Sequence, residues 1–174
     1  MIKIHYIYGQ KSDKKTLLFR GKRLGDGKWV EGMYCYAERS LAKGKNQHKD
    51  WIVTMFAANG GWLTPLARYP VIPETIGQYT GFKDKNNQYV FDGDILLFGK
   101  TRFLIWWNKE AFQWQAKLIQ LFEDPFNKIT SGVVWDNVPL DRIACEKSIH
   151  GKTTSEIIGN IYDNPELMMK KIKS

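Results

Sequence analysis

The sequence predicts a mainly β fold, either a bent sheet or a small SH3-like barrel, with additional hairpins and one short C-terminal helix. Short segments in which apolar and polar residues alternate recur along the chain, which is the pattern of half-buried strands. Aromatic residues make up 14% of the 174 residues, and aromatic side chains favour strands. Glycine, asparagine and aspartate turns separate the segments at close spacing, and many short strands so spaced favour a barrel or bent sheet.

The first third of the chain predicts a hairpin, a loop and a strand. Two extended runs, 17–20 and 28–36, are joined by the turn residues Gly25-Asp26-Gly27, so we expect them to pair. Residues 40–50 are polar and basic and show no alternation, which predicts an exposed loop. Another strand is predicted at 51–56.

The second half predicts further hairpins. Residues 82–91 contain Asn86-Asn87 between short extended arms, which is typical of a tight turn. Residues 94–98 pair with 102–107 in the next predicted hairpin, and residues 140–146 fit either a helix or a strand. One bent sheet or small barrel is expected to comprise residues 88–121 and 155–162, with buried side chains at Ile95, Leu97, Ile105, Phe112, Trp114 and Ile158.

The C-terminal segment predicts a strand followed by a short helix. Residues 156–162 form the strand, Asn164 suits the N-cap position and Pro165 suits the first helical position. We expect this segment to be a structural clasp. The side chains predicted to pack against the sheet are those of Leu167 and Met168.

Composition predicts a single domain spanning residues 1–174, because chains of this length commonly form one core. The apolar content of 43% excludes a wholly disordered chain. No run of about 18 apolar residues is present, and the N-terminal segment lacks the apolar core of a signal peptide. With two cysteines far apart in sequence, the chain is predicted to be cytoplasmic and without a membrane partner.

Three blocks of sequence resemble a known family. They are FRGK with KWVEG within residues 19–32, IPETIGQYTGFKDKNNQYVFDGDIL at 72–96, and EIIGNIYDNPEL at 156–167. Together they resemble the YopX-like family of phage and prophage proteins, with family-like blocks at about 17–37, 72–98 and 155–169. The resemblance implies a mainly β fold and no particular chemistry. The resemblance implies nothing about residues 1–15, 40–50 and 120–154, where the sequence departs from the family pattern.

Metal and nucleotide motifs are missing from the sequence. The histidines and cysteines are scattered without a short ligand pair such as C-x-x-C, so we predict no metal site and no cofactor. A phosphate-loop reading of His150 to Thr153 fails because Glu146 occupies the position of the required glycine. Cys35 alternates with two tyrosines in a predicted strand, and we expect it to be buried. The residues considered as metal ligands are His5, His48, His150, Cys35 and Cys145.

Carboxylates supply the enzyme hypothesis. Asp84, Asp92 and Asp94 lie close in sequence and, with Glu74, could form a metal or acid–base site. Turn formation already accounts for Asp84 and Asp92, because aspartate in turns accepts hydrogen bonds from nearby backbone. An enzyme with a carboxylate-centred site near Asp92 and Asp94 is therefore the alternative hypothesis.

The charge distribution supplies the leading hypothesis. The chain carries a net charge of +8, and its first 50 residues hold 12 basic and five acidic residues. This asymmetry suggests an anionic partner, although a solvated basic face is the simpler interpretation. We predict a non-catalytic binding module for nucleic acid or for a phage or host protein, and self-association is left open. Trp29 and Trp51 are interpreted as core residues. The candidate nucleic-acid contacts are Arg20, Lys22, Arg23, Lys43, Lys45 and Lys49.

Overall fold

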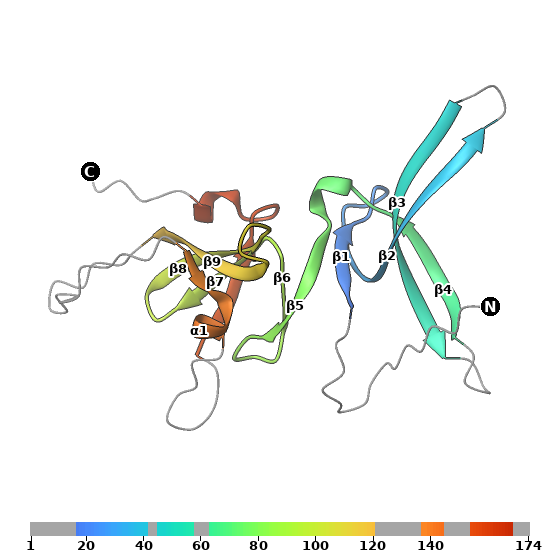
Figure 1. Ribbon diagram of the computed structural model, residues 1–174. Helices are drawn as coiled ribbons and strands as arrows, with labels where there is room; N and C mark the ends of the chain where they lie inside the picture. The colour runs from blue at the N-terminus through green and yellow to red at the C-terminus, as the bar shows by residue number, and fades with distance from the viewer. Residues whose placement is uncertain (1–16, 42–44, 58–62, 121–136, 145–153, 169–174) are drawn as a thin grey trace, which may run out of the picture. The chain divides into compact units, whose positions relative to one another are not determined.

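A computed structural model describes residues 17–41, 45–57, 63–120, 137–144 and 154–168 (Figure 1). These residues are mainly β, which confirms the predicted fold class. The strands of the described part form antiparallel sheets that do not close into a barrel. The chain divides into two compact units, unit 1 (Met1–Gln78) and unit 2 (Tyr79–Ser174). Each unit is described by itself below, and the single-domain assignment stays a prediction.

Unit 1 is an antiparallel sheet in which β1 and β2 form the predicted first hairpin. Its strands run in the order β4-β3-β2-β1, and the first two residues of β5 pair with β1. A 3-10 turn, Pro73–Thr75, precedes β5, and Thr75 Oγ1 accepts a hydrogen bond of 2.9 Å from the Lys22 backbone N–H. The strands are β1 (Phe19–Lys22), β2 (Trp29–Leu41), β3 (Lys45–Ala57), β4 (Leu63–Pro70) and β5 (Gly77–Lys83).

The buried part of unit 1 is small. Ile52 and Val71 are almost fully buried, and Leu18 is also buried. Gly32 on β2 lies so close to β3 that an added Cβ would be 2.4 Å from the Val53 carbonyl oxygen. A side chain at that position would therefore push the two strands apart.

The expected loop at 40–50 is wrong. Apart from residues 42–44, which lie outside the described residues, it forms the end of β2 and the start of β3, and the pairing extends to Leu41 opposite Lys45. Antiparallel pairing satisfies backbone N–H and C=O groups whether or not one face is apolar. The strands therefore continue into a polar sequence, which periodicity alone reads as a loop. Cys35, on the part of β2 that pairs only with β3, is exposed rather than buried.

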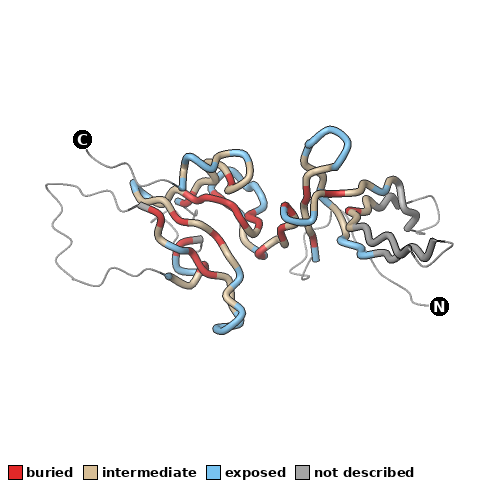
Figure 2. Tube along the Cα trace, turned by 90° about the horizontal axis from the view of Figure 1, so that it is seen from above, coloured by how far each residue is buried: buried red, intermediate tan, exposed pale blue. Residues whose placement is uncertain are grey.

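Unit 2 contains a larger core on an antiparallel sheet. The strand order is β10-β9-β8-β7-β11, and β5 pairs with β6 in the hairpin predicted around Asn86-Asn87. Buried residues recur along these strands (Figure 2). The elements are β6 (Tyr89–Phe91), β7 (Asp94–Phe98), β8 (Thr101–Asn108), β9 (Gln113–Gln120), β10 (Asn137–Pro139), α1 (Leu140–Ala144), β11 (Glu156–Asn160) and the 3-10 turn η2 (Pro165–Met168). The core cluster is Val90, Leu96, Phe103, Ile105, Ala116, Leu140 and Ile143.

The predicted burial of unit 2 is confirmed at some positions and wrong at one. Ile95 and Ile105 are fully buried. Phe112 is 82% exposed, because it precedes β9 in a turn where its φ is +49°. In the ambiguous segment 140–146, Leu140–Ala144 form the helix α1, and residues 145–146 lie outside the described residues. The remaining three expected core residues, Leu97, Trp114 and Ile158, are half-buried.

The C-terminal turn is attached to the sheet, with two differences from the prediction. The Arg102 side chain donates a 3.0 Å hydrogen bond from Nη1 to the Leu167 carbonyl oxygen, and Leu167 is half-buried. Met168 is exposed. The Asn164 side-chain oxygen accepts from the Asn160 backbone N–H at 3.4 Å instead of capping η2. The reason is that the chain turns sharply after β11, which brings Asn164 back beside Gly159. No helix among the described residues is long and apolar enough to span a membrane.

Candidate functional site

Two of the predicted nucleic-acid contacts lie on one face of unit 1 together with an indole ring. In the β1–β2 ladder Arg20 is opposite Glu31 and Lys22 is opposite Trp29, and residues directly opposite each other share a face. The Arg20 Cζ lies 4.7 Å from the centroid of the Trp29 ring, and the Lys22 Nζ lies 5.5 Å from it. We call Arg20, Lys22 and Trp29 the basic–aromatic face. Trp29, interpreted above as a core residue, is half-buried there.

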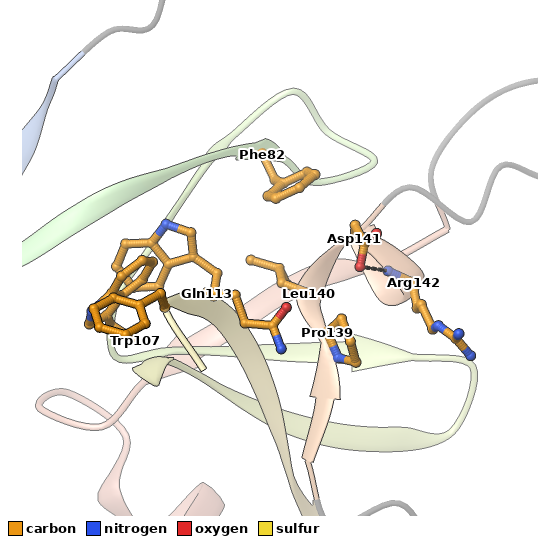
Figure 3. Close-up of a pocket in the computed structure, with 9 residues that line it drawn as sticks. Phe82, Trp107, Gln113, Pro139, Leu140, Asp141 and Arg142 are labelled. Atoms are coloured by element: carbon orange, nitrogen blue, oxygen red, sulfur yellow. Dashed lines mark hydrogen bonds between the residues drawn. The ribbon is translucent and has the colours of Figure 1, made fainter. Parts of the chain in front are cut away.

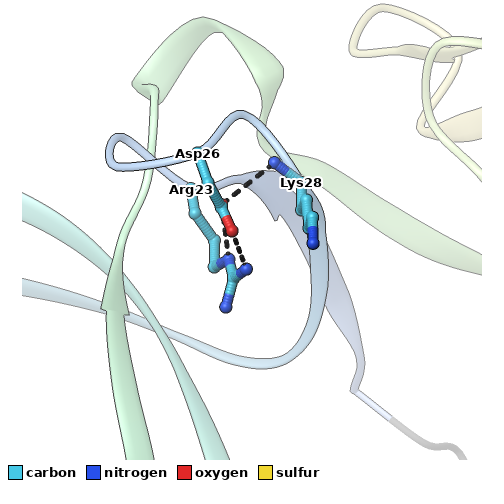
Figure 4. A network of polar contacts seen from close by, with 3 residues as sticks. All are labelled: Arg23, Asp26 and Lys28. Atoms are coloured by element: carbon cyan, nitrogen blue, oxygen red, sulfur yellow. Dashed lines mark hydrogen bonds and ion pairs between the residues drawn. The ribbon is translucent and has the colours of Figure 1, made fainter.

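Arg23 is committed to the turn between β1 and β2. Its Nε donates a 2.8 Å hydrogen bond to Asp26 Oδ1, and its Nη2 forms an ion pair with Asp26 Oδ2 (Figure 4). The Lys28 backbone N–H also donates to Asp26 Oδ1. The hydrogen bond from Arg23 is the main reason that the pKa of Asp26 is lowered. Arg23 also lies over the Tyr69 ring, at 5.0 Å, so its guanidinium serves the local structure.

The three remaining predicted contacts lie on or near the long β2–β3 hairpin. Lys45 and Lys49 belong to β3, where their backbones pair with Leu41 and Ala37. Lys43 lies outside the described residues. The structure thus brings Arg20 and Lys22 together around Trp29, and it places Lys45 and Lys49 on a neighbouring strand pair.

The carboxylates of the enzyme hypothesis are built into turns. Asp84 is 2% exposed, and its carboxylate accepts hydrogen bonds from the backbone N–H groups of Asn86 and Gln88 (2.8 and 2.9 Å) and of Ile157 (3.2 Å). Asp94 is fully buried, and its Oδ2 accepts from the Phe91 N–H at 2.8 Å.

The other two carboxylates do not complete a metal site in the described part of the chain. Asp92 is half-buried, and Glu74 is an exposed residue of unit 1. Among the described residues, no group of three or more histidine, cysteine, aspartate or glutamate side chains could hold a metal ion.

An open pocket of about 480 Å³ lies within unit 2. Phe82 lies above Leu140 and Gln113, with Trp107 at one end of the pocket and Asp141 and Arg142 at the other (Figure 3). The Trp107 and Trp114 rings meet edge to face with centroids 5.1 Å apart. The complete lining is Phe82, Trp107, Phe112, Gln113, Trp114, Pro139, Leu140, Asp141 and Arg142.

Sequence reasoning missed this pocket, and it assigned two of its four aromatic residues, Phe112 and Trp114, to the core. Phe112 and Trp114 alternate with polar neighbours, which is the pattern of one buried strand face. A second signal was present. Asn108 starts a turn in which its Oδ1 accepts from the Glu110 and Ala111 N–H groups. Phe112 follows at the end of this turn, a position where glycine or asparagine is favoured. A phenylalanine there is unusual, and this is the second signal.

A comparison with protein families gives a match over most of the chain. The family model described as YopX protein matches residues 18–169, which is most of the chain. The match includes all three quoted blocks that carry the resemblance, at 19–32, 72–96 and 156–167. No curated protein sequence matches the chain.

Proposed function

We propose that this chain, a member of the YopX family, is a non-catalytic module that binds nucleic acid through the basic–aromatic face of unit 1. The single observation that carries the proposal is the placement of Arg20 and Lys22 around the Trp29 ring. The family resemblance also leads us to propose a phage or prophage setting, and the two cysteines far apart in sequence support a proposed cytoplasmic location.

The chemistry of this face suits a phosphate backbone with accessible bases. Guanidinium and ammonium groups contact phosphate oxygens and release condensed counterions when they do so. An aromatic ring beside them can stack on a base of a single strand, which adds roughly 1–3 kcal/mol per base in known single-strand binders. Trp29 is only half-buried, so part of its ring remains accessible to solvent.

The charge of the surrounding sequence supports the same ligand. The first 50 residues carry 12 of the 26 lysines and arginines of the chain and only five of its 18 acidic residues. Lys45 and Lys49 on β3 extend the basic sequence along the hairpin. A surplus of this kind attracts polyanions at long range and weakens with salt, because salt screens exposed charges.

A matched pair of double variants tests the proposal by fluorescence anisotropy with labelled single- and double-stranded oligonucleotides. Arg20→Ala/Lys22→Ala is expected to weaken binding about tenfold or more at low salt and to lower the salt slope by about two, one for each phosphate contact. The control, Lys83→Ala/Lys85→Ala, removes the same charge from unit 2, where Lys83 lies 4.8 Å over the Tyr89 ring. It is expected to leave binding close to that of the wild type.

The hairpin lysines are tested separately by reversing the charge at Lys43, Lys45 and Lys49. A uniform loss of affinity across unrelated sequences is expected, because phosphate contacts carry no sequence information. Absence of binding at micromolar protein in low salt would refute the nucleic-acid function. Equal losses in the unit 1 and unit 2 double variants would refute the assignment to the basic–aromatic face.

A further inference from the structure

We propose that the pocket of unit 2 binds a nucleobase, either in a free nucleotide or at an accessible position of a single strand. This site is separate from the basic–aromatic face, and its argument rests only on residues of unit 2. Its volume of about 480 Å³ falls in the range of roughly 300–1,000 Å³ that is typical of sites for small organic ligands. The shape and chemistry of its walls then specify the ligand class.

The walls favour a planar ring. Four aromatic side chains line the pocket, and Phe82 from β5 lies on a different element from the three that come from β8, β9 and the turn between them. Trp107 is 42% exposed although it packs edge to face on Trp114. Rings presented in this way bind planar ligands by stacking, and stacking is tolerant of the identity of the base.

Phe112 occupies a position where an aromatic residue is unfavourable for the stability of the fold. Its φ of +49° lies in the left-handed region, which is unfavourable for a residue with a Cβ. Its side chain is also 82% exposed, so it gains little from burial. Glycine would relieve the backbone strain in the same turn. Strained residues of this kind cluster at ligand sites, where they serve ligand binding and not the stability of the fold.

The polar groups of the lining match the edge and the phosphate of a nucleotide. The Gln113 amide offers a donor and an acceptor, the combination that pairs with the edge of adenine, and the Asp141 carboxylate accepts from exocyclic amino groups. Arg142, the next residue along α1, supplies a cation for phosphate.

A cationic ligand is disfavoured by the same residues. Aromatic cages do bind ammonium groups, but Asp141 and Arg142 together leave this lining with no net charge. Unit 2 as a whole is close to neutral, with 13 lysines and arginines against 12 acidic residues, so its charge adds no attraction for a cation. A nucleotide combines the planar ring that the walls fit with a phosphate that Arg142 can contact.

Phe112→Gly of the full chain separates binding from folding. Because glycine suits the left-handed backbone, the variant is expected to unfold at the same temperature as the wild type or higher. Isothermal titration calorimetry with adenosine and uridine monophosphates is expected to show at least a tenfold loss of affinity. Phe112→Tyr keeps a ring and should restore binding. Tyr89→Ala, which removes an exposed ring outside the pocket lining, is the matched control and should bind as the wild type does.

Two further ligands define what is recognised. Ribose 5-phosphate, which lacks the base, is expected not to bind, and tetramethylammonium is expected not to compete. Saturable binding of mononucleotides identifies a free-nucleotide site. If mononucleotides bind too weakly to measure, a loss of single-stranded but not double-stranded oligonucleotide affinity in Phe112→Gly identifies a strand site.

The proposal is overturned if Phe112→Gly changes neither nucleotide nor single-strand affinity, or if ribose 5-phosphate or tetramethylammonium binds as well as the nucleotides. Its failure is distinct from that of the basic–aromatic face. Arg20→Ala/Lys22→Ala is expected to leave mononucleotide binding unchanged, so each variant reports on its own site.

Discussion

The turn between β1 and β2 and the turn between β5 and β6 are both organised by an aspartate, in very different surroundings. Asp26 of unit 1 is exposed and is bound by Arg23 and by the Lys28 N–H, both within three residues of it. Asp84 of unit 2 is buried and accepts from two N–H groups of its own turn and from Ile157, 73 residues away. One aspartate shapes a local turn, whereas the other also joins a hairpin to β11.

The difference shows how one residue type serves local or tertiary structure. An exposed carboxylate can exchange its partners for water at little cost. A buried one cannot, because its donors would also be left without partners in a low-dielectric interior. Polar contacts in unit 2 should therefore affect stability more than the corresponding contacts in unit 1.

The largest effect is expected for Asp84→Ala. Removing the carboxylate leaves three backbone N–H groups without their acceptor, and we expect a loss of about 3 kcal/mol in the free energy of unfolding. Urea denaturation followed by circular dichroism measures it. Asp84→Asn keeps one oxygen acceptor, so its free energy of unfolding should lie between those of the wild type and of Asp84→Ala.

Asp26→Ala is the matched control, and its unfolding midpoint should stay close to that of the wild type because Asp26 is exposed. Equal destabilisation by Asp26→Ala and Asp84→Ala would contradict the distinction between the two turns.

Alanine substitutions at two glycines extend the comparison. Their expected effects on stability are intermediate in size and opposite in sign, a loss in unit 2 and no loss in unit 1. A Cβ at Gly159 on β11 would lie 2.4 Å from Asn164 Oδ1 and 3.0 Å from Leu167 Cδ1. Gly159→Ala should therefore cost about 1–3 kcal/mol, as overpacking does. At Gly25 nothing lies within 4 Å of an added Cβ, so Gly25→Ala should be neutral or stabilise by up to about 1 kcal/mol.

Thermal unfolding of both alanine variants gives the result. Adding Asn164→Ala to Gly159→Ala should recover part of the loss, because the closest clash is with the Asn164 side chain. No recovery would show that the clash with the Asn164 side chain does not cause the loss. Equal melting temperatures for the two glycine variants would show that the segment after β11 tolerates the extra methyl group.

The smallest effect is expected at an exposed contact of unit 1. Tyr34 Oη donates a 2.6 Å hydrogen bond to Asp50 Oδ1 across β2 and β3, and this bond is the main reason that the pKa of Tyr34 is raised to about 12. Because the folded protein favours the protonated phenol, the contribution to stability is present below pH 10 and is lost as the pH rises towards 12.

Absorbance of tyrosinate at high pH measures this titration. Tyr34→Phe should remove a tyrosinate transition near pH 12, and Asp50→Asn should lower the pKa of Tyr34. Stability of the wild type relative to Tyr34→Phe should decline above pH 10. Ionisation of Tyr34 near pH 10 would show that the hydrogen bond is not maintained in solution.

Local patterns in the sequence predicted much of the fold. The hairpins at β1–β2, β5–β6 and β7–β8 follow from alternation interrupted by turn residues, and all three are present. The polar half of the β2–β3 hairpin was missed because its pairing depends on cross-strand backbone bonds and not on an apolar face. Alternation of apolar and polar residues is the signal used to predict strands, and a mostly polar stretch does not contain it.

The candidate sites were predicted less well than the fold. Charge asymmetry pointed to Arg20 and Lys22, but no pattern distinguished them from Arg23, which the ion pair with Asp26 commits to a turn. Trp29 was read as a core residue, as was Phe112. Both rings lie in segments predicted to be strands, and the sequence of a strand does not reveal whether a facing layer covers that side of it.

The sequence by itself therefore determined the strand periodicity, the turn chemistry and the basic balance of the first third, because each depends on neighbours a few residues apart. Only the tertiary structure decided that Asp84 receives the Ile157 N–H and that Gly159 faces Asn164. It also decided that Phe82 from β5 and Asp141 from α1 line one pocket with Phe112. Burial and convergence depend on segments distant in the chain, and their spacing in the folded molecule is set by packing and not by local sequence.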